Sequence, residues 1–172
     1  MAQLKDSMTH FITEEEIQKA TYRLAKELEI DYHGRPIHFI CPLKGSFVFM
    51  ADLCRQISVQ QTIDFVYLKS IESGQSVEIR KDIQTNITDK HVIIVEEIID
   101  TGKTLKFLTE RLKASRPASL KILTLLDKPA RREIPLKPDY TGITIDDRYV
   151  VGYGMDSEEL GRNYANIYSF KM

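Results

Sequence analysis

Apolar and polar residues follow two different periods along this chain, and each period predicts one kind of element. Thr13 and Glu16 have the spacing of a capping box, and an apolar stripe at helical spacing begins directly after it. The stripe consists of Ile17, Ala20, Leu24 and Leu28. We therefore expect a helix over residues 14–28, with this stripe against the core.

Short apolar runs rich in β-branched residues predict buried strands in the middle of the chain. We expect strands at 37–41, 62–70, 92–95 and 119–128, and helices at 47–57 and 103–114. Residues 71–82 are polar and charged, so we expect a loop there with a short strand at 77–80. The residues beyond 139 have the pattern of short strands joined by turns.

The alternation of strands and helices predicts an α/β fold with a central, mostly parallel sheet flanked by helices. Ligands of such folds bind beyond the carboxyl ends of the strands. Three predicted loops follow those ends, at 42–46, 96–104 and 127–133, and each carries lysine or carboxylate side chains. One pocket can therefore use all three loops.

The bulk composition narrows the class of protein. The 172 residues suit one domain, which we expect to span 1–172, and a formal net charge of -1 argues against nucleic acid as the partner. Cys41 and Cys54 lie in apolar stretches and are expected to be free thiols of a reducing compartment. The chain lacks a signal-peptide core and any apolar run of the roughly 20 residues that a membrane span needs. We expect a cytoplasmic protein with no membrane partner.

The stretch VIIVEEIIDTGKT at residues 92–104 carries the most specific chemistry. Gly102 permits a tight turn where a helix begins, and helix starts offer unpaired N–H donors and positive potential. Thr101 and Thr104 add hydroxyl donors, so the turn suits a phosphate group. Considered alone, the turn is equally compatible with an ordinary helix cap that binds no ligand.

A nucleoside-triphosphate P-loop is excluded, although the same turn contains Gly-Lys-Thr. That motif has a glycine five residues before its Gly-Lys pair, and this chain has Glu97 at that position. A carboxylate there would repel the phosphates, so the turn must serve a different phosphate ligand.

Three carboxylates of this stretch are candidate binding and catalytic groups. Consecutive strand side chains point to opposite faces, so Glu96 and Glu97 can share a ligand only where the strand gives way to a loop. Carboxylates accept hydrogen bonds from sugar hydroxyls and attract Mg²⁺, usually through water. Asp100 lies at the mouth of the phosphate turn, where it can hold or remove a proton. The alternative is that these acids have no ligand and simply mark a solvated strand end. That alternative does not explain why three acids stand among apolar residues and beside an anion-binding turn.

As a whole, the stretch resembles the phosphoribosyl-pyrophosphate signature of type I phosphoribosyltransferases and is most similar to the hypoxanthine-guanine members. The resemblance extends over about residues 36–165, through PLKGSFVFMADL, LLDKPARR, DRYVVGYGMD and ELGRNY. It implies the type I phosphoribosyltransferase fold, with a small hood formed by N- and C-terminal segments. It also implies purine salvage, in which a 5-phosphoribosyl group passes from phosphoribosyl pyrophosphate to hypoxanthine or guanine, giving IMP or GMP and pyrophosphate.

The resemblance assigns the sugar and its phosphate to the central stretch. Asp100 would be the general base at purine N7, while Glu96 and Glu97 would bind the ribose hydroxyls and Glu96 would help to position Mg²⁺. The residues that would hold the 5-phosphate, together with Asp100, are Thr101, Gly102, Lys103 and Thr104.

The resemblance assigns the leaving group and the base to other segments. Lys44, Gly45 and Arg162 would bind pyrophosphate, with a cis peptide bond between Leu43 and Lys44. Lys128 would donate to purine O6 and N7, which favours 6-oxopurines over adenine. The other implied purine contacts are stacking by Tyr149, the carbonyls of Val150 and Asp156, and closure by Met155; Asp156 would also be a ligand of a second Mg²⁺.

Two positions depart from the family pattern, and both affect how the site closes. Residues 71–82, with Gly74, match the family's mobile lid, which excludes water from the activated sugar. Glu97 stands where the family usually has aspartate, which extends the reach of the carboxylate by about 1 Å. Ile71 stands where the family usually has tyrosine, so a hydroxyl is lost there.

Several alternatives stay open on the sequence. An adenine enzyme would have no use for Lys128, whereas xanthine preference depends on the groups that face purine C2. An RNA-binding regulator on the same fold would need a basic face, which the near-neutral charge disfavours. A binding module without activity would have no use for Asp100. The ratio of hypoxanthine to guanine use, and whether the implied assembly is a homodimer or a homotetramer, are left open.

Overall fold

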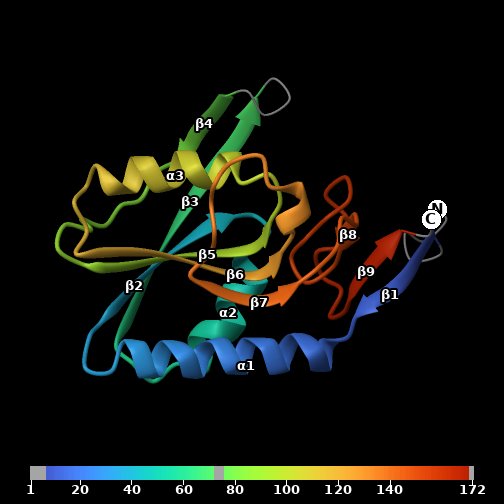
Figure 1. Cartoon of the computed structure of the whole chain (residues 1–172), viewed down its shortest axis with the longest axis horizontal. Coiled ribbons are helices and arrows are strands. Elements are labelled where there is room, and N and C mark those ends of the chain that lie inside the picture. The colour runs from blue at the N-terminus through green and yellow to red at the C-terminus, as the bar shows by residue number, and fades with distance from the viewer. Residues whose placement is uncertain (1–6, 72–75, 171–172) are drawn as a thin grey trace.

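A mixed sheet of six strands forms the centre of the molecule, in the order β4-β3-β2-β5-β6-β7 (Figure 1). The computed structural model describes residues 7–71 and 76–170. Its central strands are β2 (Ile37–Leu43), β3 (Gln61–Ile71), β4 (Ser76–Lys81), β5 (His91–Ile99), β6 (Ser119–Asp127) and β7 (Tyr140–Thr144). All neighbours pair in parallel except β3 and β4. The expected α/β class is confirmed.

Helices cover both faces of this sheet because strand side chains alternate between them. Odd-numbered positions such as Phe39 and Ile93 pack with α1 (Glu14–Asp31) and α2 (Phe47–Arg55) in one core. Even-numbered positions such as Ile94 pack with α3 (Lys103–Lys113) in a second core. Figure 1 shows α3 on one side of the sheet and α1 on the other. None of the helices in the described part of the chain is long and apolar enough to cross a membrane.

Segments from both ends of the chain form a second, three-stranded antiparallel sheet. Its order is β1 (Met8–Ile12), β9 (Ile167–Phe170) and β8 (Val150–Val151), so the first and last strands pair directly (Figure 1). The expected small hood is therefore confirmed. A five-residue strand such as β1 has no independent stability and forms here because β9 supplies its backbone partners.

The predicted helix and strand boundaries are wrong by a few residues at several ends. The first helix starts with the predicted capping box but continues to Asp31, and α2 ends two residues early, at Arg55. β2 continues to Leu43 because its pairing with β3 extends through Leu43 and Tyr67, so the following loop starts at Lys44.

The short strand expected at 77–80 within the loop over residues 71–82 is confirmed as β4, which is longer by one residue at each end. β3 extends to Ile71, and β4 pairs with it antiparallel from Ser76, which faces Ile71, to Lys81. The segment is thus mostly a hairpin in the described residues, because backbone pairing with β3 orders a polar sequence that has no buried face of its own. Gly74 and its neighbours lie outside the described residues.

The sheet opens between β2 and β5, and this opening fixes the position of the site. The two strands pair only from Ile37 and His91 to Ile40 and Ile94, although both continue for several residues. The strand order also reverses here, with β3 and β4 on one side and β6 and β7 on the other. A crevice beyond the strands at such a reversal is where open α/β sheets bind ligands.

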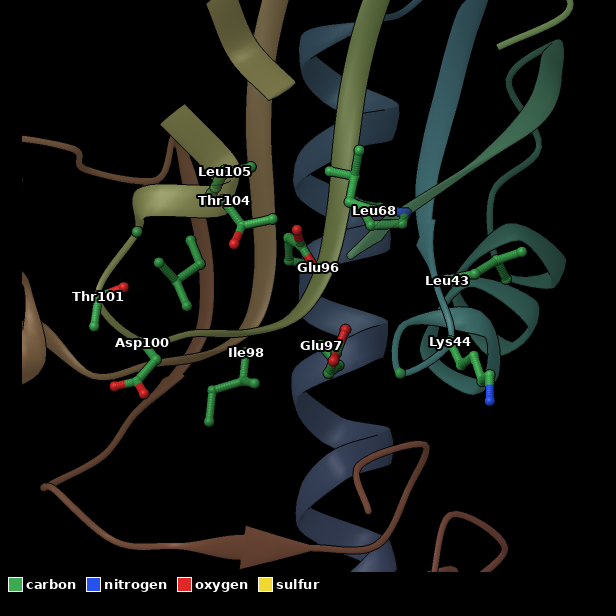
Figure 2. A pocket seen from close by; sticks show the side chains of 14 residues that line it. Leu43, Lys44, Leu68, Glu96, Glu97, Ile98, Asp100, Thr101, Thr104 and Leu105 are labelled. Atoms are coloured by element: carbon green, nitrogen blue, oxygen red, sulfur yellow. The ribbon is translucent and has the colours of Figure 1, made fainter. Parts of the chain in front are cut away.

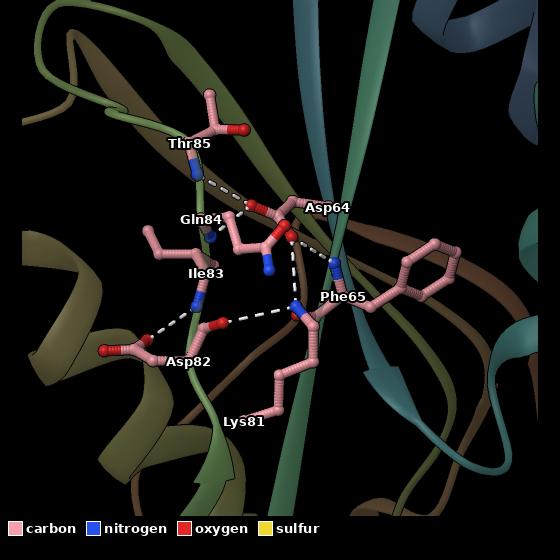
Figure 3. A network of polar contacts seen from close by, with 7 residues as sticks. All are labelled: Asp64, Phe65, Lys81, Asp82, Ile83, Gln84 and Thr85. Atoms are coloured by element: carbon pink, nitrogen blue, oxygen red, sulfur yellow. Dashed lines mark hydrogen bonds and ion pairs between the residues drawn. The ribbon is translucent and has the colours of Figure 1, made fainter.

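Asp64 on β3 anchors the base of the β3–β4 hairpin (Figure 3). Its carboxylate accepts hydrogen bonds from the backbone N–H groups of Gln84 at 2.7 Å, Thr85 at 2.9 Å and Phe65 at 2.8 Å. It also forms an ion pair with Lys81 at 3.4 Å. Burial alone would raise the pKa of this carboxyl, but the backbone donors and Lys81 outweigh it and lower the pKa to about 2.

We predict that Asp64→Asn lowers the free energy of unfolding at pH 7 by about 2 kcal/mol. The pKa of Asp64 is lower in the folded chain than in the unfolded one, so its contribution is fully present above about pH 4 and is lost as the pH falls toward 2. Urea unfolding at pH 7 and at pH 3 measures both effects. Glu110→Gln, at a side chain 66% exposed, is the control; a deficit in Asp64→Asn that stays constant with pH would contradict the assignment.

Candidate active site

The crevice between β2 and β5 contains a polar cavity of about 220 Å³ (Figure 2). Its walls come from the end of β2, the last part of β5 and the start of α3. The residues that line it are Pro42, Leu43, Lys44, Gly45, Leu68, Glu96, Glu97, Ile98, Ile99, Asp100, Thr101, Gly102, Thr104 and Leu105. The loops predicted after the first and third strands therefore do meet at one cavity. Leu68 and Ile98, which the sequence did not single out, supply apolar walls.

The turn before α3 has the conformation that the sequence predicted. Gly102 adopts φ 84°, which side-chain-bearing residues rarely do, and α3 begins at the next residue. Gly102 has no side chain to cap this helix end, and the Lys103 N–H makes only a long hydrogen bond of 3.4 Å to Thr101 Oγ1, so the start of α3 can present backbone N–H donors to an anion at the cavity. Thr101 and Thr104 lie on the cavity, whereas Lys103 is absent from its lining and pairs with Glu133 at 2.5 Å.

Glu96 and Glu97 lie side by side on the cavity wall (Figure 2). The expectation that the strand ends at them is wrong, because β6 pairs with β5 as far as Ile99. The two side chains still share the cavity, since β2 stops pairing with β5 at Ile94 and leaves that edge open.

Burial raises the pKa of both glutamates, and their mutual repulsion raises that of Glu96 further. Arg162 acts in the opposite direction on Glu97. Two neighbouring carboxyls buried in this way are stabilised by a positive charge placed between them. A pair of this kind therefore suits a cation or a hydroxyl donor.

The loop at Lys44 and Gly45 passes under the carboxylate of Glu97. The peptide bond between Leu43 and Lys44 is cis, as the resemblance implied. A Cβ at Gly45 would lie 1.9 Å from Oε1 of Glu97, so a larger residue there would force the Glu97 side chain out of this position. The extra methylene of Glu97, compared with the aspartate usual in the family, thus brings its carboxylate onto the loop.

A second cavity, of about 210 Å³, adjoins the first and shares Glu97, Ile98 and Asp100 with it. Its other lining residues are Lys128, Tyr149, Val150, Met155 and Asp156, all of which the sequence had proposed. The two cavities together reach the range of about 300–1,000 Å³ typical of small-molecule sites. A ligand with two parts can therefore span both, with Asp100 at the junction.

The second cavity offers a cation and a ring at its walls. Lys128 is 7% exposed, and in the described residues no ion pair or hydrogen bond of its ammonium group is recorded. Tyr149 is 59% exposed, packs against Phe170 at 5.4 Å between ring centroids, and donates its hydroxyl to the Asp156 carbonyl at 3.2 Å. A planar ligand with an acceptor oxygen would satisfy Lys128 and cover Tyr149.

Two arginines that the sequence did not assign hold Asp100 in place. Arg131 Nε lies 3.1 Å from Asp100 Oδ1, and Arg132 donates to the backbone carbonyl of Asp100 at 2.6 Å. Arg132 also pairs with Asp127 at the end of β6. The short 3-10 helix Pro129–Arg131 places both arginines, and the sequence DKPARR offered only their charge as a signal.

A third group of charges lies where the hood meets the cavity. Arg162 pairs with Asp156 at 2.8 Å and donates to the Gly154 carbonyl at 2.9 Å. Lys44 pairs with Glu159 at 2.8 Å, a residue that the sequence analysis missed. The structure therefore brings Lys44 and Arg162 together, as expected for a common anionic ligand.

The carboxylates of Glu96 and Asp156 suit a divalent cation whose remaining coordination positions are filled by water and by a bound substrate. Among the described residues no three His, Cys, Asp or Glu side chains gather as a complete metal site. Mg²⁺ commonly uses only one or two protein carboxylates together with water and substrate phosphates. Glu96, paired with Glu97 in the first cavity, and Asp156 in the second fit this incomplete donor set.

The chain is similar to known proteins in sequence and in fold. A family model described as a phosphoribosyl transferase domain matches residues 11–158. A hypoxanthine-guanine phosphoribosyltransferase of Staphylococcus aureus is 43% identical over 164 residues, covering 93% of this chain and 92% of that protein. The crystal structure of a hypoxanthine-guanine phosphoribosyltransferase of Bacillus anthracis, with HEPES in its active site, has a TM-score of 0.92 at 44% identity and covers 95% and 98% of the two chains. A hypoxanthine phosphoribosyltransferase structure from S. aureus has a TM-score of 0.94 at 40% identity, covering 98% and 94%.

We predict that Arg132→Met lowers the free energy of unfolding by about 3–5 kcal/mol, because it leaves the buried carboxylate of Asp127 unpaired. The two side chains are only 11% and 13% exposed. The control is Lys19→Met, which removes a pair with Glu15 that is 72% and 77% exposed and should cost less than about 1 kcal/mol. Guanidinium unfolding measures both changes, and equal losses in the two variants would show that the Arg132 pair has no special structural role.

Proposed function

The chain belongs to the phosphoribosyl transferase family, and we propose that its two adjoining cavities carry out the transfer of a 5-phosphoribosyl group to a purine. Its activity is that of a hypoxanthine-guanine phosphoribosyltransferase, an enzyme of purine salvage. Phosphoribosyl pyrophosphate and a 6-oxopurine are the substrates, and the nucleoside monophosphate and pyrophosphate are the products.

One observation supports the assignment of the sugar to the first cavity and of the base to the second: the two cavities meet at Asp100. A phosphosugar in the first cavity and a base in the second would bring the anomeric carbon and the attacking nitrogen together at this junction. Holding both reactants in this geometry removes much of the entropic barrier to a two-substrate reaction.

In this assignment the first cavity binds the sugar. The Gly102 turn and the start of α3 would bind the 5-phosphate through backbone N–H groups, with Thr101 and Thr104 contributing hydroxyls. The Glu96 and Glu97 carboxyls would accept hydrogen bonds from the ribose hydroxyls.

Asp100 would act as the general base. Its carboxylate would take the proton from purine N7, so that N9 can form the bond to the anomeric carbon as the bond to pyrophosphate breaks. A positioned base contributes about 10²–10⁴-fold to a rate. Arg131, 3.1 Å away, and Arg132, on the backbone carbonyl, would keep this carboxylate in its orientation.

Lys44, Arg162 and the loop at Gly45 would bind the departing pyrophosphate. Two Mg²⁺ ions, one held through Glu96 and the second through Asp156, would stabilise the negative charge that grows on the leaving oxygens. Lys44 and Arg162 supply positive charge at the same place, and the β3–β4 hairpin borders the cavity through Leu68.

Lys128 would select the base. Its buried ammonium group suits the O6 and N7 acceptors of a 6-oxopurine, whereas adenine offers a donor at position 6. Tyr149 would stack on the ring, Met155 would close its other side, and the Val150 carbonyl would accept from N1. Xanthine use depends on the groups at purine C2 and stays open.

Two further properties are proposals. A cytoplasmic location is supported by the unpaired thiols of Cys41 and Cys54. Burial raises the pKa of Cys41 to about 12, as suits a thiol that packs in the core and does not react. A homodimer or homotetramer is expected from the resemblance, without a residue that decides between them.

We predict that Asp100→Asn lowers kcat by about 10²–10⁴-fold, because the amide cannot accept the N7 proton. The KM for phosphoribosyl pyrophosphate should change little, since the phosphate turn keeps its backbone donors. Steady-state kinetics at saturating hypoxanthine measure both. Asp147→Asn is the control, because Asp147 lies 3.7 Å from the same Arg131; an unchanged kcat in Asp100→Asn would reject the base assignment.

We predict that Lys128→Met raises the KM for hypoxanthine and guanine by about 10–100-fold, the loss expected for a charged donor. Parallel spectrophotometric assays with hypoxanthine, guanine, xanthine and adenine report the change in preference. Lys137→Met removes an exposed lysine and serves as the control. Equal affinity for hypoxanthine before and after the change at Lys128 would show that this residue does not contact the base.

We predict that chelating Mg²⁺ with excess EDTA abolishes transfer and that added Mg²⁺ restores it. The reason is that Lys44 and Arg162 alone leave most of the pyrophosphate charge without a partner. Full turnover in excess chelator would refute the metal assignment.

A further inference from the structure

Glu159 sits at the tip of a tight turn at the edge of the site. Ser157 and Leu160 exchange two backbone hydrogen bonds, at 2.9 and 3.0 Å, which closes a two-residue hairpin. The two residues at its tip, Glu158 and Glu159, both have positive φ, of 52° and 66°. Such turns strongly favour asparagine and glycine, so two glutamates there are unusual and must be held by contacts.

Two contacts with the site hold Glu159 in this turn. Its backbone N–H donates to Asp156 Oδ2 at 2.8 Å, while Asp156 Oδ1 pairs with Arg162 at 2.8 Å. The side chain of Glu159 then reaches back toward the cavity entrance. In the described residues Glu158, one position earlier, has no recorded ion pair.

A single carboxylate oxygen of Glu159 contacts both cations of the leaving-group site. Oε2 lies 2.8 Å from Lys44 Nζ and 3.4 Å from Arg162 Nη2. The bond to Lys44 lowers the pKa of Glu159 and raises that of Lys44, so both groups are charged at neutral pH. Arg162 Nε is buried and has no acceptor among the described residues, so an anion would reach this guanidinium at the Nη2 end that Glu159 contacts.

We propose that Glu159 is an internal competitor of pyrophosphate, which sets the affinity of the site for the leaving group. The inference rests on the proposed function, in which Lys44 and Arg162 bind pyrophosphate. Pyrophosphate must displace the Glu159 carboxylate from both cations before it binds, and the carboxylate returns as pyrophosphate leaves. Glu159 thereby weakens pyrophosphate binding and speeds its release.

The charge and the exposure of Glu159 and Lys44 indicate that pyrophosphate can displace the Glu159 carboxylate, so this carboxylate does not block the site permanently. The Glu159 and Lys44 side chains are 65% and 49% exposed, and ion pairs this exposed are weak. Pyrophosphate carries several negative charges and competes easily with one carboxylate. The displaced carboxylate also stays close to the bound anion and repels it.

The test is calorimetric titration of the full chain with inorganic pyrophosphate in the presence of Mg²⁺. Glu159→Gln should bind pyrophosphate about 2–5-fold more tightly than the unmodified chain, the effect expected for removing one weak, exposed competitor. The difference should shrink at high salt, which screens the ion pair. In turnover assays, Glu159→Gln should show a lower KM for phosphoribosyl pyrophosphate and stronger product inhibition by pyrophosphate.

Glu158→Gln is the matched control, because it removes the same charge from the neighbouring position of the same turn. It should leave pyrophosphate affinity unchanged. Ribose 5-phosphate is the control ligand, since it would bind at the Gly102 turn, and its affinity should be equal in all three proteins. A Glu159→Gln variant that binds pyrophosphate no more tightly than the unmodified chain, or no more tightly than Glu158→Gln, overturns the inference.

The inference and the proposed function fail in different ways. If ribose 5-phosphate binds but pyrophosphate binds to none of the three proteins, both the competitor role and the assignment of Lys44 and Arg162 are wrong. If the unmodified chain binds both ligands and transfers phosphoribosyl groups, and Glu159→Gln matches it, only the competitor role is wrong.

Discussion

The separation of β2 from β5 beyond Ile40 and Ile94 is the constraint on which the site depends. Up to that pair the sheet is closed by backbone hydrogen bonds and by apolar side chains on both faces. Beyond it, β5 keeps only β6 as a partner, so its last residues border a crevice. Glu96 and Glu97 both border this crevice, although consecutive side chains of a fully paired strand face opposite sides of the sheet.

The two loops above this crevice are packed by backbone contact. Glu97 lies on Gly45, and a Cβ at Gly154 would come 1.9 Å from the Gly45 carbonyl oxygen. Arg162 extends the same contact by donating to the Gly154 carbonyl. The loop at Gly45, which would hold the leaving group, therefore packs directly on the segment at Gly154, which would hold the base. The close approach at the two glycines fixes the position of one segment relative to the other.

Much of the fold and of the site could be predicted because local patterns specify them. The apolar periods of α1 and α3 gave the helices, and the Gly102 turn was identified from its composition. The β1 strand could not be predicted, since its partner, β9, lies at the other end of the sequence. The ion pairs of Asp100 with Arg131 and of Lys44 with Glu159 could not be predicted either, because the charge of a residue does not say which partner it meets in the fold. A short strand was expected at 77–80, but its antiparallel pairing with β3 was not, because a polar sequence without an apolar side does not specify its partner.

The pairing of β1 with β9 has a consequence for how the two cavities depend on the rest of the fold. The six-stranded sheet and the phosphate turn contain neither strand. The hood needs both, because β9 joins β1 to β8, the strand that carries Val150, and supplies Phe170 against Tyr149. Fraying of the β1–β9 pair would therefore disturb the purine cavity before it disturbs the phosphate turn.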